Sequence, residues 1–193
     1  MIVVYGGAFN PPTKAHYEIA KTICQQLQPK AFVFLPVGDQ YEKADLAPAT
    51  HRIKMLQLLA NKLPKATVST LEVQSPRVLT TYESLSTLQH NQPDESYAFV
   101  IGADNLAQLP LWSQSESLLH DFKLIVLKRD GQDVEALIMK YFKMYASQFI
   151  VLDGFAELNL SSTMYRTNLN ASSVCLHEVD AYVHQFKLYG RGE

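Results

Sequence analysis

Short apolar runs alternate with stretches of helical periodicity along most of the chain. The apolar runs, each of a length that suits a strand, lie at residues 2–5, 31–36, 67–69, 97–101, 122–127 and 149–152, and helical patterns lie at about 14–28, 48–61, 81–90 and 133–146. Strands that alternate with helices form parallel sheets whose two faces are covered. We therefore expect an α/β fold of the Rossmann-like, doubly wound kind, with a mainly parallel sheet of about five to six strands and helices on both faces.

The length and composition favour a single globular domain. The chain has 193 residues, of which 47% are apolar and 19% charged. We expect one domain over residues 1–193, with about 161–193 as a C-terminal helical part. The net charge is −2 and the basic residues are scattered, which argues against a nucleic acid as the chief partner.

The sequence shows no signal-peptide pattern, and no apolar stretch approaches the ~18 residues typical of a membrane span. Cys24 and Cys175 are far apart and fit no metal-binding spacing. Cys24 lies in an apolar helical pattern, which predicts a buried thiol in a reducing compartment. We therefore expect a cytoplasmic protein with no membrane partner.

Ligands of doubly wound sheets bind beyond the carboxyl ends of the strands, where the strand order reverses. Four segments with chemically useful side chains come directly after expected strands or lie beyond the last one, at residues 6–16, 38–43, 102–104 and 161–166. The carboxyl ends of parallel strands share one edge of the sheet. We therefore expect these four segments to lie close together.

The first segment reads Gly6-Gly7-Ala8-Phe9-Asn10-Pro11-Pro12-Thr13-Lys14-Ala15-His16. Gly6 and Gly7 would allow positive φ angles and a close approach of the backbone to a ligand. Thr13 can cap the following helix, which places His16 in the first turn, where it could bind a phosphate attracted by the helix dipole. The alternative is a tight turn with a solvent-exposed histidine. The segment matches neither the P-loop nor the dinucleotide-binding glycine pattern.

The last segment contains Ser161, Ser162, Thr163 and Arg166. Either serine can cap a helix, and free N–H groups with hydroxyls form an anion site there. Arg166 follows Thr163 by one helical turn and could hold a phosphate in a bidentate manner. An ordinary helix cap is the alternative interpretation, because serine and threonine are common at that position.

Gly102 ends a predicted strand and suits the close approach of a ligand. Asp104 could cap a helix, contact a ribose hydroxyl or orient a lysine, and Trp112 could stack on a heteroaromatic ring or fill the core. Lys43 and Arg52 are interpreted as solvated surface charges. The histidines show no metal-ligand spacing with one another, which predicts no protein-bound metal.

Taken together, these segments resemble the nucleotidyltransferases that carry a His/Thr-x-Gly-His motif. Residues 6–16 resemble the first motif of that class, and residues 161–166 resemble the second. Within the class, the chain is most similar to the bacterial nicotinate-nucleotide adenylyltransferases, in residues 34–38, Lys43, 46–52, Thr81, Tyr82, 101–106, Trp112 and the tail 179–189. Thr13 stands where that family usually has its first histidine, and Ala15 stands in place of the glycine.

The resemblance implies an adenylyltransferase that moves AMP from ATP to nicotinate mononucleotide, giving deamido-NAD and pyrophosphate in NAD biosynthesis. It implies Mg²⁺ held mainly through the ATP phosphates. The implied catalytic residues are His16, Thr13 and Arg166. The implied ATP-binding residues are Gly7, Ala8, Phe9, Thr13, His16, Gly102, Asp104, Ser161, Ser162, Thr163 and Arg166. The implied nicotinate-nucleotide-binding residues are Lys43, Thr81, Tyr82 and Trp112.

Two alternatives remain open because of Thr13 and Ala15. One is adenylyl transfer to another phosphate, such as nicotinamide mononucleotide or a pantetheine phosphate. The other is a nucleotide-binding regulatory module without turnover. The sequence also leaves open whether the protein is a homo-oligomer.

Overall fold

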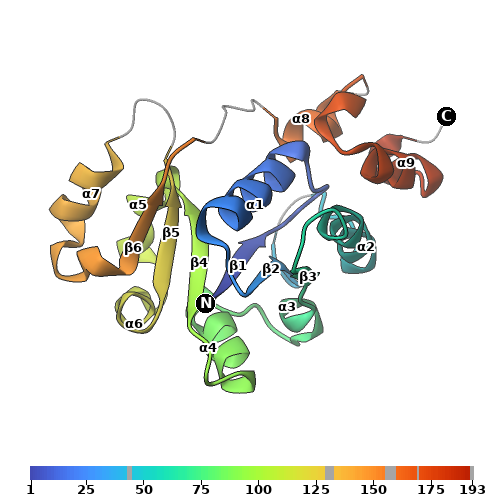
Figure 1. The fold of residues 1–193 in the computed structure, drawn as a ribbon. Helices are drawn as coiled ribbons and strands as arrows, with labels where there is room; N and C mark the ends of the chain where they lie inside the picture. The colour runs from blue at the N-terminus through green and yellow to red at the C-terminus, as the bar shows by residue number, and fades with distance from the viewer. Residues whose placement is uncertain (43–44, 129–132, 155–159, 169, 192–193) are drawn as a thin grey trace.

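The computed structural model describes residues 1–42, 45–128, 133–154, 160–168 and 170–191. Over these residues the strands form one six-stranded sheet in the order β3-β2-β1-β4-β5-β6, and every neighbouring pair is parallel. The strands are β1 (Ile2–Gly7), β2 (Ala31–Pro36), β3 (Ala66–Val68), β4 (Tyr97–Gly102), β5 (Lys123–Leu127) and β6 (Phe149–Leu152). The predicted Rossmann-like α/β fold is therefore confirmed (Figure 1).

Helices connect the strands and continue after the last one. The α-helices are α1 (Lys14–Leu27), α2 (Ala49–Ala60), α3 (Leu71–Gln74), α4 (Thr81–Asn91), α5 (Ala103–Leu106), α6 (Ser115–Asp121), α7 (Val134–Tyr141), α8 (Ser162–Thr167) and α9 (His177–Gln185). The 3₁₀ helices are η1 (Leu109–Leu111), η2 (Lys143–Gln148), η3 (Ser172–Val174) and η4 (Leu188–Gly190). None of the helices in the described ranges is long and apolar enough to cross a membrane.

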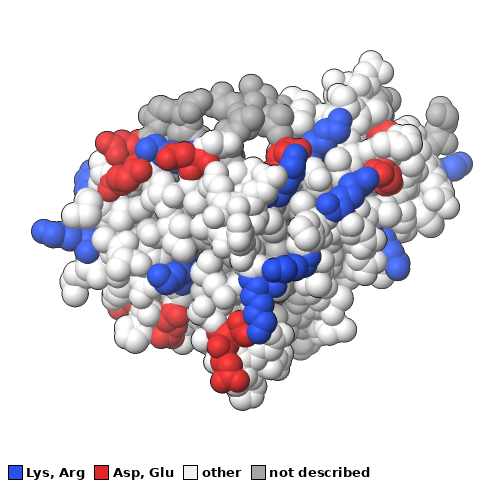
Figure 2. Space-filling view, viewed as in Figure 1, with Lys and Arg blue, Asp and Glu red and all other residues white. Residues whose placement is uncertain are grey.

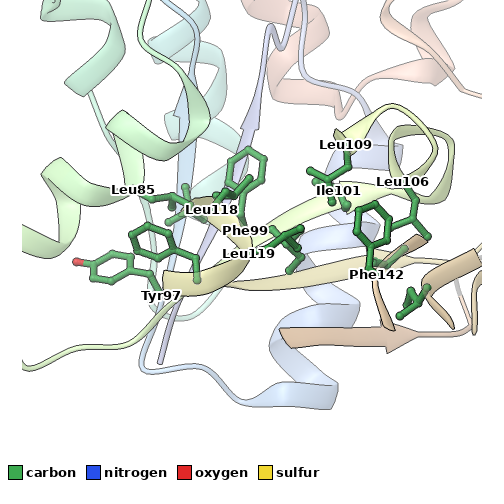
Figure 3. Packing of buried hydrophobic residues seen from close by; sticks show 14 of the residues in the cluster. Leu85, Tyr97, Phe99, Ile101, Leu106, Leu109, Leu118, Leu119 and Phe142 are labelled. Atoms are coloured by element: carbon green, nitrogen blue, oxygen red, sulfur yellow. The ribbon is translucent and has the colours of Figure 1, made fainter. Parts of the chain in front are cut away.

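Side chains of each strand alternate between two hydrophobic layers, one on each face of the sheet. In β1, Val3 packs with α1 and α2, whereas Ile2 and Val4 pack with the layer under α4, α5, α6 and α7. Figure 3 shows part of the second layer, in which Phe99 of β4 meets Leu85 of α4 and leucines of α6. The sheet is thus buried on both faces, as the apolar strands require.

The strand order reverses between β1 and β4, and the two strands separate there. Their pairing runs from Ile2↔Tyr97 to Val4↔Phe99 and goes no further. On its other side β1 stays paired with β2 as far as Gly7↔Pro36. The carboxyl half of β1 therefore has β2 on one side and a gap in backbone pairing on the other, which is the place where a doubly wound sheet binds its ligand.

The C-terminal helices pack on α2 through a third hydrophobic cluster. Met55 of α2 lies in this cluster with Tyr165 of α8 and with Val179 and Val183 of α9. Figure 1 shows α9 beside α2, and α8 near the N-terminal end of α1. The expected C-terminal helical part therefore packs against the sheet domain through α2.

One local prediction differs from the structure. The expected helix over 133–146 ends at Tyr141, where Phe142 turns into the core.

Basic and acidic side chains are interspersed over the face of the molecule that Figure 2 shows. This distribution fits the near-neutral net charge of −2. The expectation that nucleic acid is not a partner stays a prediction.

Candidate active site

The first loop leaves the sheet where β1 and β4 separate. A side chain at Gly6 would place its Cβ 2.8 Å from Cζ of Phe99, and one at Gly7 would come within 3.3 Å of the Phe9 ring. Both glycines belong to the extended strand β1, and the positive φ angle lies instead at Phe9 (45°). Neither glycine uses the positive φ angle that it would allow, and the absence of a side chain makes room for the neighbouring rings instead.

His16 lies in the first turn of α1 with its imidazole held in one orientation. The backbone N–H of Thr13 donates to His16 Nδ1 at 2.9 Å, and the Thr13 hydroxyl lies 2.8 Å from the same nitrogen. The ring packs edge-on to Phe9, with centroids 5.1 Å apart. An amide N–H can only donate, so Nδ1 is the acceptor and the neutral ring carries its proton on Nε2. Thr13, at the N-cap position, therefore presents His16 as an Nε2–H donor.

The second predicted segment docks directly on the first loop. Ser162 Oγ donates to the Pro11 carbonyl at 2.8 Å, and Arg166 Nη1 donates to the Asn10 carbonyl at 2.7 Å. Ser161 caps α8, since its hydroxyl accepts from the Met164 N–H at 3.0 Å. Segments that lie about 150 positions apart in the sequence thus meet at the carboxyl edge of the sheet.

Arg52 is not the solvated surface charge that the sequence predicts. Its side chain is fully buried and donates from Nε to the Ala47 carbonyl at 2.8 Å. Nη1 donates to the carbonyls of Val37 and Ala8, at 2.8 and 3.2 Å. Nη2 donates to Asp39 Oδ1 at 2.9 Å. Arg52 is therefore no solvated surface charge, because its guanidinium joins the loops that follow β1 and β2.

The sequence assigns no role to Asn10. It is 1% exposed, and its Nδ2 donates to the Asp45 carbonyl at 2.7 Å. Its Oδ1 accepts from the Ala47 N–H at 3.0 Å and from the Tyr189 hydroxyl at 2.8 Å. Asn10 thus ties the first loop to the loop after β2 and to the end of the chain.

Gly102 ends β4 and occupies the N-cap of α5. A Cβ at this position would collide with the Asp104 carboxylate, which lies exposed in the first turn of α5. Trp112 follows η1 and is half-buried against the hydrophobic layer under α4 to α7. It therefore packs on the core while part of the indole stays accessible.

Thr81 and Tyr82 begin α4, after the cap residue Thr80. The Tyr82 hydroxyl donates to Asp121 Oδ2 at 2.9 Å, and its ring meets Phe122 edge-on with centroids 5.9 Å apart. Phe122 directly precedes β5, so these contacts place the Tyr82 side chain toward the amino ends of the strands. Its predicted contact with the nicotinate nucleotide gains no support from this position.

The predicted residue Lys43 lies outside the described residues.

Among the described residues, no group of three or more His, Cys, Asp or Glu side chains is arranged to hold a metal ion.

In a doubly wound sheet the crevice at the reversal of strand order receives the ligand, and here the loop that leads to His16 leaves β1 at that crevice. Fold and site together define a nucleotide-binding α/β protein.

The comparisons with known proteins agree with this class. The model of the cytidylyltransferase-like family matches residues 4–168, and the chain belongs to this family. The chain is 33% identical to an Acholeplasma laidlawii protein that is named "Probable nicotinate-nucleotide adenylyltransferase", over 98% of this chain and 97% of the relative. A Carboxydothermus hydrogenoformans protein of the same name is 26% identical, over 96% and 94%. The nucleotidyltransferase resemblance predicted from the motifs is confirmed.

Solved structures support the fold. Plasmodium falciparum nicotinic acid mononucleotide adenylyltransferase complexed with NaAD superposes with a TM-score of 0.82, over 99% of this chain and 98% of that chain. The complex of that enzyme with APC gives a TM-score of 0.81. Sequence identity is 19% in both cases.

Proposed function

We propose that this protein is an adenylyltransferase that moves AMP from ATP to nicotinate mononucleotide, giving deamido-NAD and pyrophosphate in NAD biosynthesis. The observation that carries the proposal is the contact, at the strand-order reversal, between the two segments that are predicted to bind phosphate; Ser162 and Arg166 make this contact with the first loop. Relatives that match over nearly the whole chain carry the corresponding name, which supports the choice of acceptor.

The reaction asks the protein for positioning and for charge stabilisation. A 5′-phosphate oxygen of nicotinate mononucleotide forms a bond to the α-phosphorus of ATP, while the bond from that phosphorus to the bridging oxygen of pyrophosphate breaks. Both reactants are anions, and no covalent intermediate on the protein is needed. Catalysis then comes from alignment of the reactants and from donors aimed at the charge that develops on the phosphate oxygens.

His16 supplies a donor at the α-phosphate. Because Nδ1 accepts from the Thr13 N–H, the ring meets the phosphate with Nε2–H in a fixed direction. Such a preorganised donor needs no rearrangement as charge develops. The backbone of residues 7–9 lies along the nucleotide, and Gly102 and Asp104 border its ribose.

Arg166 neutralises the leaving pyrophosphate. A guanidinium has five N–H donors, and Arg166 uses one of them on the Asn10 carbonyl. The contact fixes the charged group beside the loop while its other donors can hold phosphate. Ser161, Ser162 and Thr163, at the start of α8, surround the β- and γ-phosphates.

Lys43, Thr81 and Trp112 would surround the nicotinate nucleotide, with the Trp112 indole stacked on the pyridine ring. Tyr82 is not included in this set, because its side chain lies toward the amino ends of the strands. Mg²⁺ would be held by the phosphates and water, with no dedicated protein ligands.

We expect the protein to act in the cytoplasm. Both of its cysteines are free thiols, and burial raises the pKa of Cys175 to about 12. Cys24, which was predicted to be buried, is only partly buried in the structure. Cysteines that remain free thiols are typical of a reducing compartment.

A pyrophosphate-release assay tests the function. The purified protein is incubated with ATP, Mg²⁺ and one of three acceptors: nicotinate mononucleotide, nicotinamide mononucleotide or phosphopantetheine. We expect deamido-NAD, identified by mass, to form at least ~10-fold faster than any other product. Preference for another acceptor would reassign the substrate. Tight ATP binding without pyrophosphate release would indicate a regulatory module.

A further inference from the structure

Tyr189 joins the C-terminal end of the described chain to the first loop. Its hydroxyl donates to Asn10 Oδ1 at 2.8 Å, across 179 positions of sequence. The Asn10 amide cannot turn freely, because Nδ2 donates to the Asp45 carbonyl and Oδ1 accepts from the Ala47 N–H. The hydroxyl therefore meets an acceptor that is already oriented. Tyr189 lies beyond residues 4–168, which match the family model.

The backbone around Tyr189 has left-handed conformations that are unfavourable for residues with a side chain. Lys187 and Tyr189 both have left-handed φ angles, 51° and 57°, and Gly190 follows with φ 71°. Residues with a side chain hold this conformation only where the surroundings fix it, and such positions are typical of functional sites. The course of the tail is therefore determined by its contacts.

A second contact anchors the tail independently of the Tyr189 hydroxyl. Arg191 is 2% exposed, and its Nη2 donates to the Tyr165 carbonyl at 2.6 Å. Its guanidinium also lies over the Tyr165 ring, 3.9 Å from the centroid. The Tyr189 ring packs edge-on against the same ring. Removal of the Tyr189 hydroxyl alone therefore leaves the tail in place and breaks only its contact with the loop.

We propose that Tyr189 is a positioning residue for adenylyl transfer, and that its hydroxyl acts through Asn10 to hold the loop between β1 and His16 in its productive place. The inference rests on the function proposed above. Asn10 receives Tyr189 on its side chain and Arg166 on its carbonyl, so a shift of Asn10 moves a phosphate-binding charge as well as the approach to His16. Burial raises the pKa of Tyr189, so the hydroxyl keeps its proton and remains a donor in any ordinary assay buffer.

The test compares Tyr189→Phe with Tyr182→Phe. Both variants lose one hydroxyl from the C-terminal part, but the Tyr182 hydroxyl lies 2.9 Å from His51 Nδ1 and does not touch the loop. We expect Tyr189→Phe to lower kcat for deamido-NAD formation about 10-fold, since small misplacements of reacting groups can cost up to about 100-fold. Tyr182→Phe should stay within about twofold of the unaltered protein, and the two variants should unfold at similar temperatures.

A double variant separates positioning from general destabilisation. In the His16→Ala background, loss of the Tyr189 hydroxyl should lower the single-turnover rate by only about threefold, because the contribution through His16 is gone and only the one through Arg166 remains. The same ~10-fold factor in both backgrounds would overturn the proposal, and so would a Tyr189→Phe rate within about twofold of the unaltered protein.

Failure of the proposed function would look different. The unaltered protein would then release no pyrophosphate with nicotinate mononucleotide. In that case the dissociation constant for ATP is measured for each variant in place of the rate of deamido-NAD formation. Tyr189→Phe should weaken ATP binding about fivefold while Tyr182→Phe does not, and equal affinities would overturn the positioning role.

Discussion

Replacement of Arg52 by methionine should destabilise the protein strongly. The guanidinium is fully buried and serves the carbonyls of Ala47, Val37 and Ala8 as well as the Asp39 carboxylate. Methionine fills a similar volume but donates no hydrogen bond. The carbonyl of buried Ala47 and those of partly buried Val37 and Ala8 would then lose this donor.

The magnitude follows from those contacts. A buried polar group left unpaired costs about 1–3 kcal/mol, and breaking a buried charged network by removing one partner costs about 3–5 kcal/mol. The Asp39 side chain is 58% exposed, so water can replace Arg52 there at little cost. The three carbonyls dominate, and we expect a loss of about 3–5 kcal/mol in the free energy of unfolding.

Urea denaturation followed by circular dichroism measures this loss. Lys54→Met is the matched control, because Lys54 lies on the exposed face of the same helix and should change stability by less than about 0.5 kcal/mol. If Arg52→Met cannot be purified folded, Arg52→Lys keeps the charge with fewer donors and should lose about 2–3 kcal/mol. A loss below about 1 kcal/mol for Arg52→Met would show that the loops after β1 and β2 do not depend on the guanidinium.

Three further predictions concern the site and the thiols. His16→Ala should lower kcat by roughly 100-fold or more, as loss of a preorganised donor does; steady-state kinetics showing less than a threefold change would contradict its role. Trp112→Ala should raise KM for the pyridine nucleotide by about 5- to 150-fold, since one stacked ring contributes about 1–3 kcal/mol; an effect confined to KM for ATP would refute stacking. Because the pKa of Cys175 is raised by burial to about 12, the unfolded chain loses this proton at lower pH than the folded chain does, and stability should fall as pH rises from about 9 toward 12. Cys175→Ala should remove part of that slope in pH-dependent denaturation, and an unchanged slope would disprove the assignment.

The fold was predictable because the relevant signals are local. Each strand is an apolar run, and between successive strands apolar residues recur at the spacing of a helix. The proximity of residues 6–16 to residues 161–166 was also predictable, because the carboxyl ends of parallel strands share one edge of the sheet. The roles of Gly6, Arg52 and Asn10 could not be predicted in this way. Each depends on a partner far along the chain, such as the Phe99 ring at Gly6 or the Tyr189 hydroxyl at Asn10.

One local signal for Arg52 was available. Arg52 precedes Met55 by three positions and Leu56 by four, and both of these side chains are fully buried. An arginine on the buried face of a helix must find several acceptors or lose stability. The helical spacing thus marks Arg52 as a buried charge, although it does not say which carbonyls converge on it.

The contacts of the first loop also explain how it can face an anion. The carbonyls of Ala8, Asn10 and Pro11 accept from Arg52, Arg166 and Ser162 respectively, so three electronegative groups of the loop are bound to protein donors. A trans peptide unit is planar, with its N–H opposite its carbonyl. The Ala8 carbonyl that points at Arg52 therefore turns the Phe9 N–H the other way.

Prolines at positions 11 and 12 have no N–H, so the peptide units that precede them need partners only for their carbonyls. This arrangement directs the backbone N–H of Phe9 away from Arg52. Phe9 has a left-handed φ of 45°, and the turn toward His16 begins there. A loop whose carbonyls are held on protein donors can approach a phosphate with little repulsion from its own oxygens. On this argument Arg52, Ser162 and Arg166 would support the proposed nucleotide binding by the orientation that they impose on the backbone of the first loop.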